Sequence, residues 1–147
     1  MTADATTTGP AAAEQPPKPR PVPTPTSEPF WDGLAVEEVR LQHCLDCGGW
    51  VFYPRSRCSH CLGDRLEWRA VSGAGLIFTF SVATQPTFSA FADEVPQIIA
   101  VVELPEGVHL TTTIVEADPA DVRVGASVVP VFDHGDDGLT LLRYRLA

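Results

Sequence analysis

The four cysteines of the chain stand in two C-x-x-C pairs, and this spacing limits the fold more than any other feature. The stretch HCLDCGGWVFYPRSRCSHC, residues 43–61, places ten residues between the pairs. Each C-x-x-C turn directs two sulfur atoms at one point, so two turns supply the four thiolates of a closed tetrahedral metal site. The predicted metal ligands are Cys44, Cys47, Cys58 and Cys61.

Other uses of the cysteines fit the sequence less well. The first ten residues, MTADATTTGP, have neither the basic nor the apolar region of a secretory signal, which favours a cytoplasmic, reducing setting without disulfides. A redox dithiol is typical of a C-x-x-C pair at the start of a helix in an α/β pattern, and neither pair has that context. Zn²⁺ is the expected ion, and iron in a rubredoxin-like centre is a minor alternative with the same geometry.

The predicted metal is structural. Four thiolates leave no coordination position for water or substrate. The ion instead replaces the hydrophobic core that a unit of about 30 residues cannot build alone. Short strands are expected around it at residues 38–43, 50–53 and 66–70.

Residues 1–27 are predicted to be a disordered leader, either a linker or a docking segment. They are rich in Pro, Ala and Thr, and QPPKPRPVPTPT favours extended polyproline geometry. The following stretch, TSEPFWDGLAVEEVRL, predicts a short helix with Ser27 as its N-cap and Pro29 in its first turn. Phe30 and Trp31 are large apolar side chains for so short an element, so we expect the protein body or a partner to cover them.

From residue 71 onward the sequence is rich in β-formers. Breakers separate five apolar, β-branched runs: GLIFTFSVATQP, PQIIAVVELPEG, VHLTTTIVEA, ASVVPVFDHG and DGLTLLRYRLA. Asp118 before Pro119 predicts a capped turn or short helix between the third and fourth runs. This order favours a small closed barrel, most commonly an oligonucleotide/oligosaccharide-binding (OB) fold, with a sandwich as the alternative.

The predicted fold class is therefore mainly β, with a short N-terminal helix, a four-cysteine zinc ribbon and a five-stranded OB-fold barrel. The expected division is a leader over residues 1–27, the helix and ribbon over 28–70, and the barrel over 71–147.

The ordered series of motifs resembles the domain-of-unknown-function-35 family. An aromatic PFWDGL helix precedes the C-x2-C-x10-C-x2-C ribbon, which is followed by LEWRAVSGAGLIFTFSV, PQIIAVVELPEGVHLTT and VGASVVPVF. The resemblance covers about residues 28–147 and implies a rubredoxin-like zinc ribbon joined to an OB-fold barrel. It further implies a non-catalytic accessory subunit that binds a thiolase-fold enzyme, either a thiolase or a lipid-transfer-protein-like aldolase, in acyl-CoA metabolism. Steroid side-chain degradation is the implied process, with the subunit stabilising the enzyme and helping to position acyl-CoA.

The charge distribution places any anion contact at the ribbon. The net charge is −9, but residues 40–69 hold five arginines against three carboxylates. Residues 70–147 hold three arginines against ten carboxylates, a local charge of −7. Arg55 and Arg57, beside the second cysteine pair, are candidate contacts for a CoA phosphate, and solvated arginines are the alternative interpretation.

A long loop, QPTFSAFADEVPQ over residues 85–97, carries Phe88 and Phe91. Loops normally hide such side chains, so these two either enter a partner's pocket, line an acyl channel, or form a small core under the loop. Together with Phe30 and Trp31 they are the candidate partner or acyl contacts.

No catalytic residue is predicted, because the cysteines are assigned to metal and no G-x-S-x-G or H-E-x-x-H motif occurs. A single-stranded nucleic-acid-binding module is the alternative function, since Phe78 and Phe80 would share one strand face and offer stacking rings. The charge of the barrel opposes that function. No run reaches the roughly 20 apolar residues of a membrane span.

Overall fold

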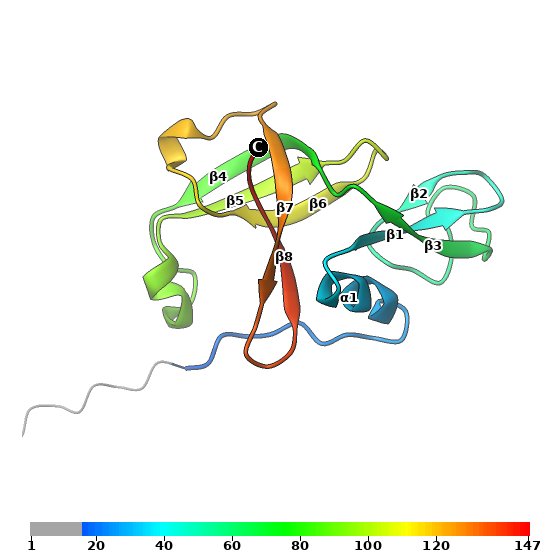
Figure 1. Cartoon of the computed structure of the whole chain (residues 1–147), viewed down its shortest axis with the longest axis horizontal. Coiled ribbons are helices and arrows are strands. Elements are labelled where there is room, and N and C mark those ends of the chain that lie inside the picture. Colours follow the sequence, from blue (N-terminus) through cyan, green and yellow to red (C-terminus); the bar gives the residue numbers. More distant parts are fainter. Residues whose placement is uncertain (1–15) are drawn as a thin grey trace, which may run out of the picture.

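A computed structural model of the chain describes residues 16–147, so the part of the predicted leader over residues 1–15 lies outside the described residues. A short helix and a three-stranded sheet come first, and a closed five-stranded barrel follows (Figure 1). The first part contains α1 (Glu28–Ala35), β1 (Val39–Cys44), β2 (Trp50–Val51) and β3 (Leu66–Val71). The barrel contains β4 (Gly75–Ala83), β5 (Gln97–Glu103), β6 (His109–Ile114), β7 (Ser127–His134) and β8 (Thr140–Leu146). Two 3₁₀ helices, η1 (Ser89–Glu94) and η2 (Pro119–Asp121), lie in its connections.

The barrel has the strand order β4-β5-β6-β8-β7 and closes through β7 and β4. Its neighbouring strands are antiparallel except β6 and β8, which run parallel where Ile114 pairs with Tyr144. The helical turn η2 lies between the third and fourth strands, and the Asp118 side chain accepts a hydrogen bond from the Ala120 N–H at 2.8 Å. All five predicted runs form strands, so the predicted mainly β fold with a closed OB-type barrel is confirmed.

The three-stranded sheet has the order β2-β1-β3, and both pairings are antiparallel. The strand predicted over residues 50–53 ends at Val51. Beyond Val51, the buried Gln42 side chain takes the place of backbone pairing between the strands. It accepts a hydrogen bond from the Arg55 N–H at 2.8 Å and donates one to the Arg55 carbonyl at 2.9 Å. The chain is thereby directed away from the sheet toward the second cysteine pair.

The ribbon and the barrel share one hydrophobic core. Leu41 of β1 is fully buried and belongs to the barrel's cluster of buried side chains, against which Trp50 and Phe52 also pack. The ribbon's own cluster is much smaller, consisting of Cys44, Val51 and Cys58 with Leu66 beside it. Such a cluster is too small to hold a fold without a metal ion or the barrel.

Helix α1 begins differently from the prediction. Pro29 lies in the first turn as expected, but the Ser27 side chain makes no capping bond to the helix. Its Oγ instead accepts from the Thr24 N–H at 2.9 Å, because the preceding residues fold into a turn. Among residues 16–147, no helix has the length and apolarity to cross a membrane.

Gly33 allows β1 to cross α1 at close range. A Cβ at this buried position would lie 2.8 Å from both the Glu38 carbonyl oxygen and Arg40 Cδ. We expect Gly33→Ala to destabilise the protein by about 1–3 kcal/mol, since overpacking against a backbone oxygen outweighs the better helix propensity of alanine. Thermal unfolding measures this effect, with Ala35→Ser at an exposed helix position as the control. An alanine variant as stable as the parent would contradict the close approach.

Strand β4 contains an irregularity that overturns one prediction. The register with β5 shifts between Ile77 and Thr79, so Phe78 is an extra residue in the strand. Phe80 consequently packs against the barrel core, whereas Phe78 is 52% exposed and stacks on His109 with ring centroids 4.4 Å apart. The two rings do not share a face, so the prediction that they form one stacking surface for nucleic acid is wrong.

Tyr144 gives the barrel a specific sensitivity to alkali. Its side chain is fully buried, and its hydroxyl has no hydrogen-bond partner among residues 16–147. Burial, with a smaller contribution from the charge of Glu106, raises the pKa of Tyr144 above its ordinary value of about 10. The fold therefore favours the neutral phenol, and this contribution is complete below pH 10 and is lost as the pH rises further.

We expect the free energy of unfolding to fall by about 1.4 kcal/mol per pH unit above about pH 10 through this group alone. Tyr144→Phe should remove that slope and leave stability at neutral pH equal or higher, since no hydrogen bond is lost. Urea unfolding at a series of alkaline pH values measures the slope. Tyr53→Phe, at the half-exposed second tyrosine, is the matched control. Parallel curves for Tyr144→Phe and the parent would refute the assignment.

Candidate functional site: a four-cysteine centre and an apolar cleft

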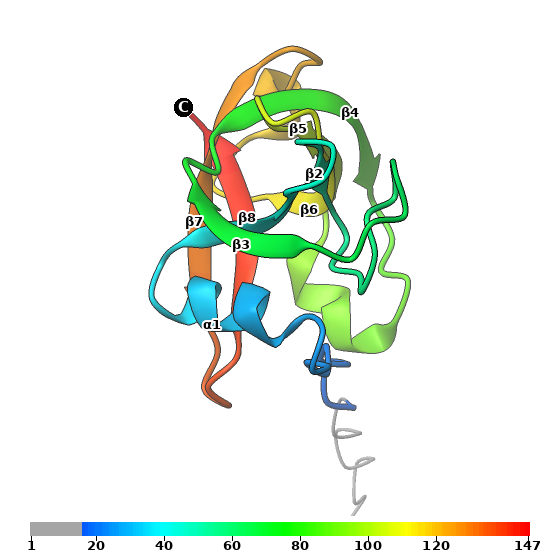
Figure 2. The ribbon, with the colours of Figure 1, turned by 90° about the vertical axis from the view of Figure 1, so that its right-hand side faces the viewer.

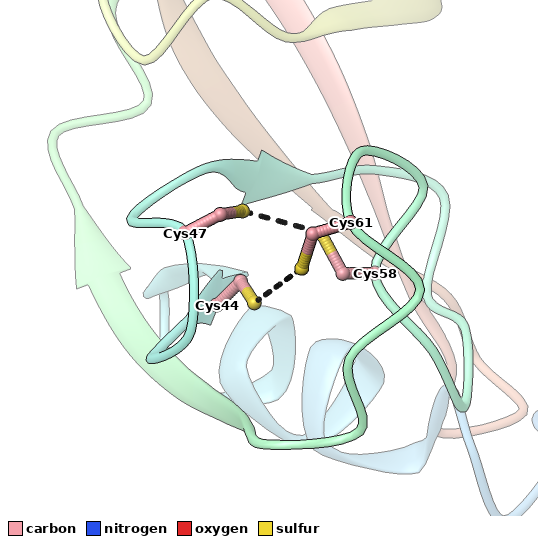
Figure 3. Close-up of side chains that lie close together, drawn as sticks. All are labelled: Cys44, Cys47, Cys58 and Cys61. Carbon is pink, nitrogen blue, oxygen red and sulfur yellow. Dashed lines mark hydrogen bonds between the residues drawn. The ribbon is translucent and has the colours of Figure 1, made fainter.

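The four cysteine side chains point toward one another from two loops of the ribbon (Figure 3). All four sulfur atoms lie within 4.8 Å of one another. The Cys44–Cys61 and Cys47–Cys58 sulfur pairs are each 3.7 Å apart. A regular tetrahedron with metal–sulfur bonds of about 2.3 Å places its sulfur atoms about 3.8 Å apart, so the donor set fits a zinc-like ion.

The two cysteine turns have the same backbone hydrogen bonds. In the first, Cys44 N–H donates to the Gly49 carbonyl and Gly48 N–H donates to the Cys44 carbonyl, at 2.8 and 2.9 Å. In the second, Cys58 N–H donates to Gly63 and Leu62 N–H to Cys58, at 2.8 and 3.1 Å. Gly48 and Leu62 occupy equivalent positions with φ of +73° and +63°. Gly48 adopts this positive φ without steric cost because glycine has no Cβ, whereas Leu62 adopts it with a side chain.

Backbone amides stabilise the thiolate form of the buried Cys58, which is the form that binds a cation. The N–H of Cys61 has the largest effect on the pKa of Cys58 and lowers it. Burial raises this pKa and the N–H of His60 lowers it further, so that it falls to about 6. The His60 amide lies 3.3 Å from the sulfur. The His60 ring is not part of the sulfur cluster, because its Nε2 donates to the Trp50 carbonyl at 3.1 Å.

An apolar cleft of about 640 Å³ lies between the ribbon and the barrel. In Figure 2, α1 and η1 both lie below the barrel, with the N-terminal segment between them. Three of the four candidate partner or acyl contacts, Phe30, Trp31 and Phe91, line this cleft. Phe30 is buried there, with its ring 5.7 Å from that of Phe52. Phe88 does not line it and is 46% exposed just before η1.

The two candidate CoA contacts, Arg55 and Arg57, are exposed on the ribbon. Arg57 Nη1 donates to the Leu62 carbonyl at 3.1 Å, in the second cysteine turn. Within residues 16–147, neither guanidinium forms an ion pair. Arg55 follows Pro54 of the cleft wall in the chain. Both side chains are therefore available to an anion, and their role in CoA binding stays a prediction.

Sequence reasoning did not find the polar end of the cleft. Gln97, Thr113 and Arg143 lie there, on strands β5, β6 and β8. The run TTT in β6 was a signal that one face of this strand is not core, but the partner residues come from strands distant in sequence. Only the closed barrel brings them together.

The comparisons with known proteins bear on both the ribbon and the barrel. Residues 31–67 match the family model described as "ChsH2, rubredoxin-like zinc ribbon domain", and residues 68–133 match "ChsH2, C-terminal OB-fold domain". A DUF35 domain-containing scaffold protein of Methanothermobacter thermautotrophicus is 39% identical over 101 residues, which cover 65% of this chain and 75% of that protein. This chain belongs to the DUF35 family.

Two further proteins are similar to this DUF35 protein. The DUF35 chain of a solved structure named "Ltp2-ChsH2(DUF35) aldolase" has a TM-score of 0.77 and 28% identity, with 86% of this chain and 98% of that chain covered. The 3-oxo-4,17-pregnadiene-20-carboxyl-CoA hydratase alpha subunit of Mycobacterium tuberculosis is 34% identical over 99 residues. That match covers 67% of this chain and 31% of the hydratase subunit, so this DUF35 protein corresponds to only part of it.

Proposed function

We propose that this DUF35 protein is a non-catalytic accessory subunit of a thiolase-fold enzyme, of the lipid-transfer-protein-like aldolase type, in acyl-CoA metabolism. The observation that carries the proposal is the match to nearly the whole DUF35 chain of an aldolase. The hydratase relative acts, by its name, on a pregnadiene carboxyl-CoA, which supports steroid side-chain degradation as the process. We place the protein in the cytoplasm, as its sequence predicts.

In this proposal the four cysteines hold Zn²⁺ as a structural ion, with iron as the minor alternative. The ion supplies a cross-link between the two cysteine turns and no Lewis-acid chemistry, because four thiolates fill its coordination shell. Side chains of the ribbon, α1 and the loop before η1 form the proposed contacts with the enzyme and with CoA. The ribbon presents Arg55 and Arg57, α1 presents Trp31, and the loop before η1 presents Phe88.

One arrangement of side chains resembles a catalytic triad but does not support catalysis. His134 Nδ1 lies 2.9 Å from Thr140 Oγ1, and His134 Nε2 lies 3.1 Å from Glu37 Oε1. Thr140 is 4% exposed, so its hydroxyl cannot reach a substrate. These contacts connect the β7–β8 hairpin to the turn after α1, and their role is structural. The proposal of a non-catalytic subunit therefore rests on the residues as well as on the scaffold name of a relative.

The proposal is tested by reconstituting the complex. The full-length chain is produced together with a thiolase-fold aldolase encoded in the same genome, and the mixture is separated by size-exclusion chromatography. We expect the two proteins to elute together, and the acyl-CoA cleavage activity of the enzyme to be higher with this chain than without it. Separate elution, turnover by this chain alone, or micromolar binding of an oligonucleotide at low salt would each contradict the proposal.

A further inference from the structure

The outer surface of the barrel forms the floor of the apolar cleft. Residues of three strands line it, among them Ile99 of β5, Thr111 and Thr113 of β6, and Leu141 and Arg143 of β8. The walls are α1, the segment over residues 52–54 and η1. A volume of about 640 Å³ lies within the range of small-molecule sites, which is about 300–1,000 Å³. The cleft is thus large enough for an organic ligand, and its lining is mainly apolar.

Polar groups gather at one end of this cleft. Arg143 donates from Nε to Asp133 Oδ2 at 2.7 Å and from Nη1 to Thr113 Oγ1 at 3.0 Å. Its side chain is only 20% exposed. A guanidinium has five N–H donors, and these two contacts leave the donors on Nη2 for a ligand oxygen. Gln97, beside it, donates to Glu94 Oε2 at 3.2 Å.

The charges at this end of the cleft are balanced, which favours a neutral ligand group over an anionic one. Two carboxylates, those of Asp133 and Glu94, lie 2.7 and 3.9 Å from Arg143 nitrogens. Lys18 also pairs with Glu94, so the two cations and the two carboxylates cancel, and no net positive charge is left to attract a phosphate or a carboxylate. Arg55 and Arg57, the predicted contacts for the CoA phosphates, are exposed and do not line this cleft. What fits beside Arg143 is a neutral oxygen that accepts a hydrogen bond.

We infer that the cleft between ribbon and barrel binds the apolar body of an acyl group that carries a carbonyl or hydroxyl at its far end, with Arg143 as the donor to that oxygen. The size, the apolar lining and the polar end are the observations that carry the inference. The identification of the ligand as an acyl group rests on the proposed function.

The N-terminal segment, defined as residues 16–27, closes part of the cleft. Val22 and Ser27 line it, and Lys18 forms an ion pair with Glu94 and lies 5.7 Å from the centre of the Phe91 ring. Arg20 pairs with Asp137 and also donates to the Leu139 carbonyl at 3.3 Å. Exposed ion pairs of this kind contribute at most about 1 kcal/mol each. The segment is therefore a wall that a ligand can displace.

Binding of a neutral fluorescent ketone tests the inference on the full-length chain. The probe is 6-propionyl-2-dimethylaminonaphthalene, and 2-dimethylaminonaphthalene is its analogue without the carbonyl. We expect saturable binding of the ketone with blue-shifted emission. Thr111→Trp, which fills the floor at an exposed position, should weaken binding at least about tenfold through lost space. Thr79→Trp, also exposed but outside the cleft, is the matched control and should leave affinity unchanged.

The polar end is tested separately with Arg143→Met. Loss of one hydrogen bond from a charged donor should weaken ketone binding about tenfold and leave binding of the analogue unchanged. Arg145→Met, at an exposed position of the same strand, is the control. Equal loss of both probes would overturn the role of Arg143. Absence of saturable binding, or binding that Thr111→Trp does not weaken, would overturn the site itself.

The enzyme complex distinguishes this inference from the proposed function. If the complex forms and the probe does not bind, the cleft inference fails and the proposed function stands. If the probe binds and no complex forms, the proposed function fails, and with it the assignment of the ligand as an acyl group. If Thr111→Trp abolishes the complex and the parent binds no probe, the cleft is a protein contact and the inference is wrong.

Discussion

Cys58→Ser is expected to abolish metal binding and to unfold the ribbon over residues 31–67. Apart from side chains such as Leu41 that join the core shared with the barrel, the buried cluster of this unit consists of Cys44, Val51 and Cys58, with Leu66 packed against it. The binding free energy of a structural zinc ion, about 10–16 kcal/mol in small zinc modules, is therefore most of its folding free energy. Serine supplies neither the thiolate nor the amide-stabilised charge of the native ligand. Metal analysis and NMR of the purified variant measure both effects.

Ser59→Ala is the matched control, because Ser59 is exposed and next to the ligand in the chain. This control should retain one metal ion for each chain, the native spectrum and the partner enzyme. Cys58→Ser should lose all three, since a disordered ribbon presents no fixed surface. A Cys58→Ser protein that keeps its fold and its partner without a metal ion would refute the structural role of the centre.

Phe88→Asp is expected to weaken the complex with the partner enzyme by about thirtyfold or more, the loss typical of an interface hot spot. Phe88 is 46% exposed at the start of η1, and within residues 16–147 it has no aromatic partner. A charge at this position costs the isolated chain little, since the ring is not in the core. Titration calorimetry of the complex and thermal unfolding of the isolated variant measure the two quantities.

Phe78→Asp provides a matched control for this prediction. Phe78 is 52% exposed, but its ring already stacks on His109 on the outer surface of the barrel. We expect this variant to bind the enzyme as the parent does. If Phe88→Asp instead lowers the stability of the isolated chain and leaves the complex intact, the loop covers a small core of its own. Loss of binding in Phe78→Asp alone would place the interface on β4.

The predictable parts of the molecule are those that local sequence specifies. The two C-x-x-C pairs determine their own turns through short-range hydrogen bonds, so the metal-capable cluster follows directly from the spacing. The five barrel strands are each a continuous apolar run between breakers, and all five form. Asp118 before Pro119 places η2 for the same local reason.

The features that escaped prediction depend on contacts between distant residues. Strand β2 ends early because Gln42, from another strand, bonds the backbone of Arg55. The irregularity at Phe78 arises from the register with β5, which the β4 sequence alone does not encode. The cleft collects residues from Val22 to Arg143, so it exists only once the barrel has closed against α1.

The boundary between the two matched family models, at residues 67 and 68, falls inside β3. Along this strand, all six residues pair with β1, and Leu41 of β1 extends into the barrel. Cutting the chain there would split a strand and expose a leucine to water, so neither piece would be a folding unit. We therefore expect ribbon and barrel to fold only as one unit, so that a transfer into a longer polypeptide would have to carry both.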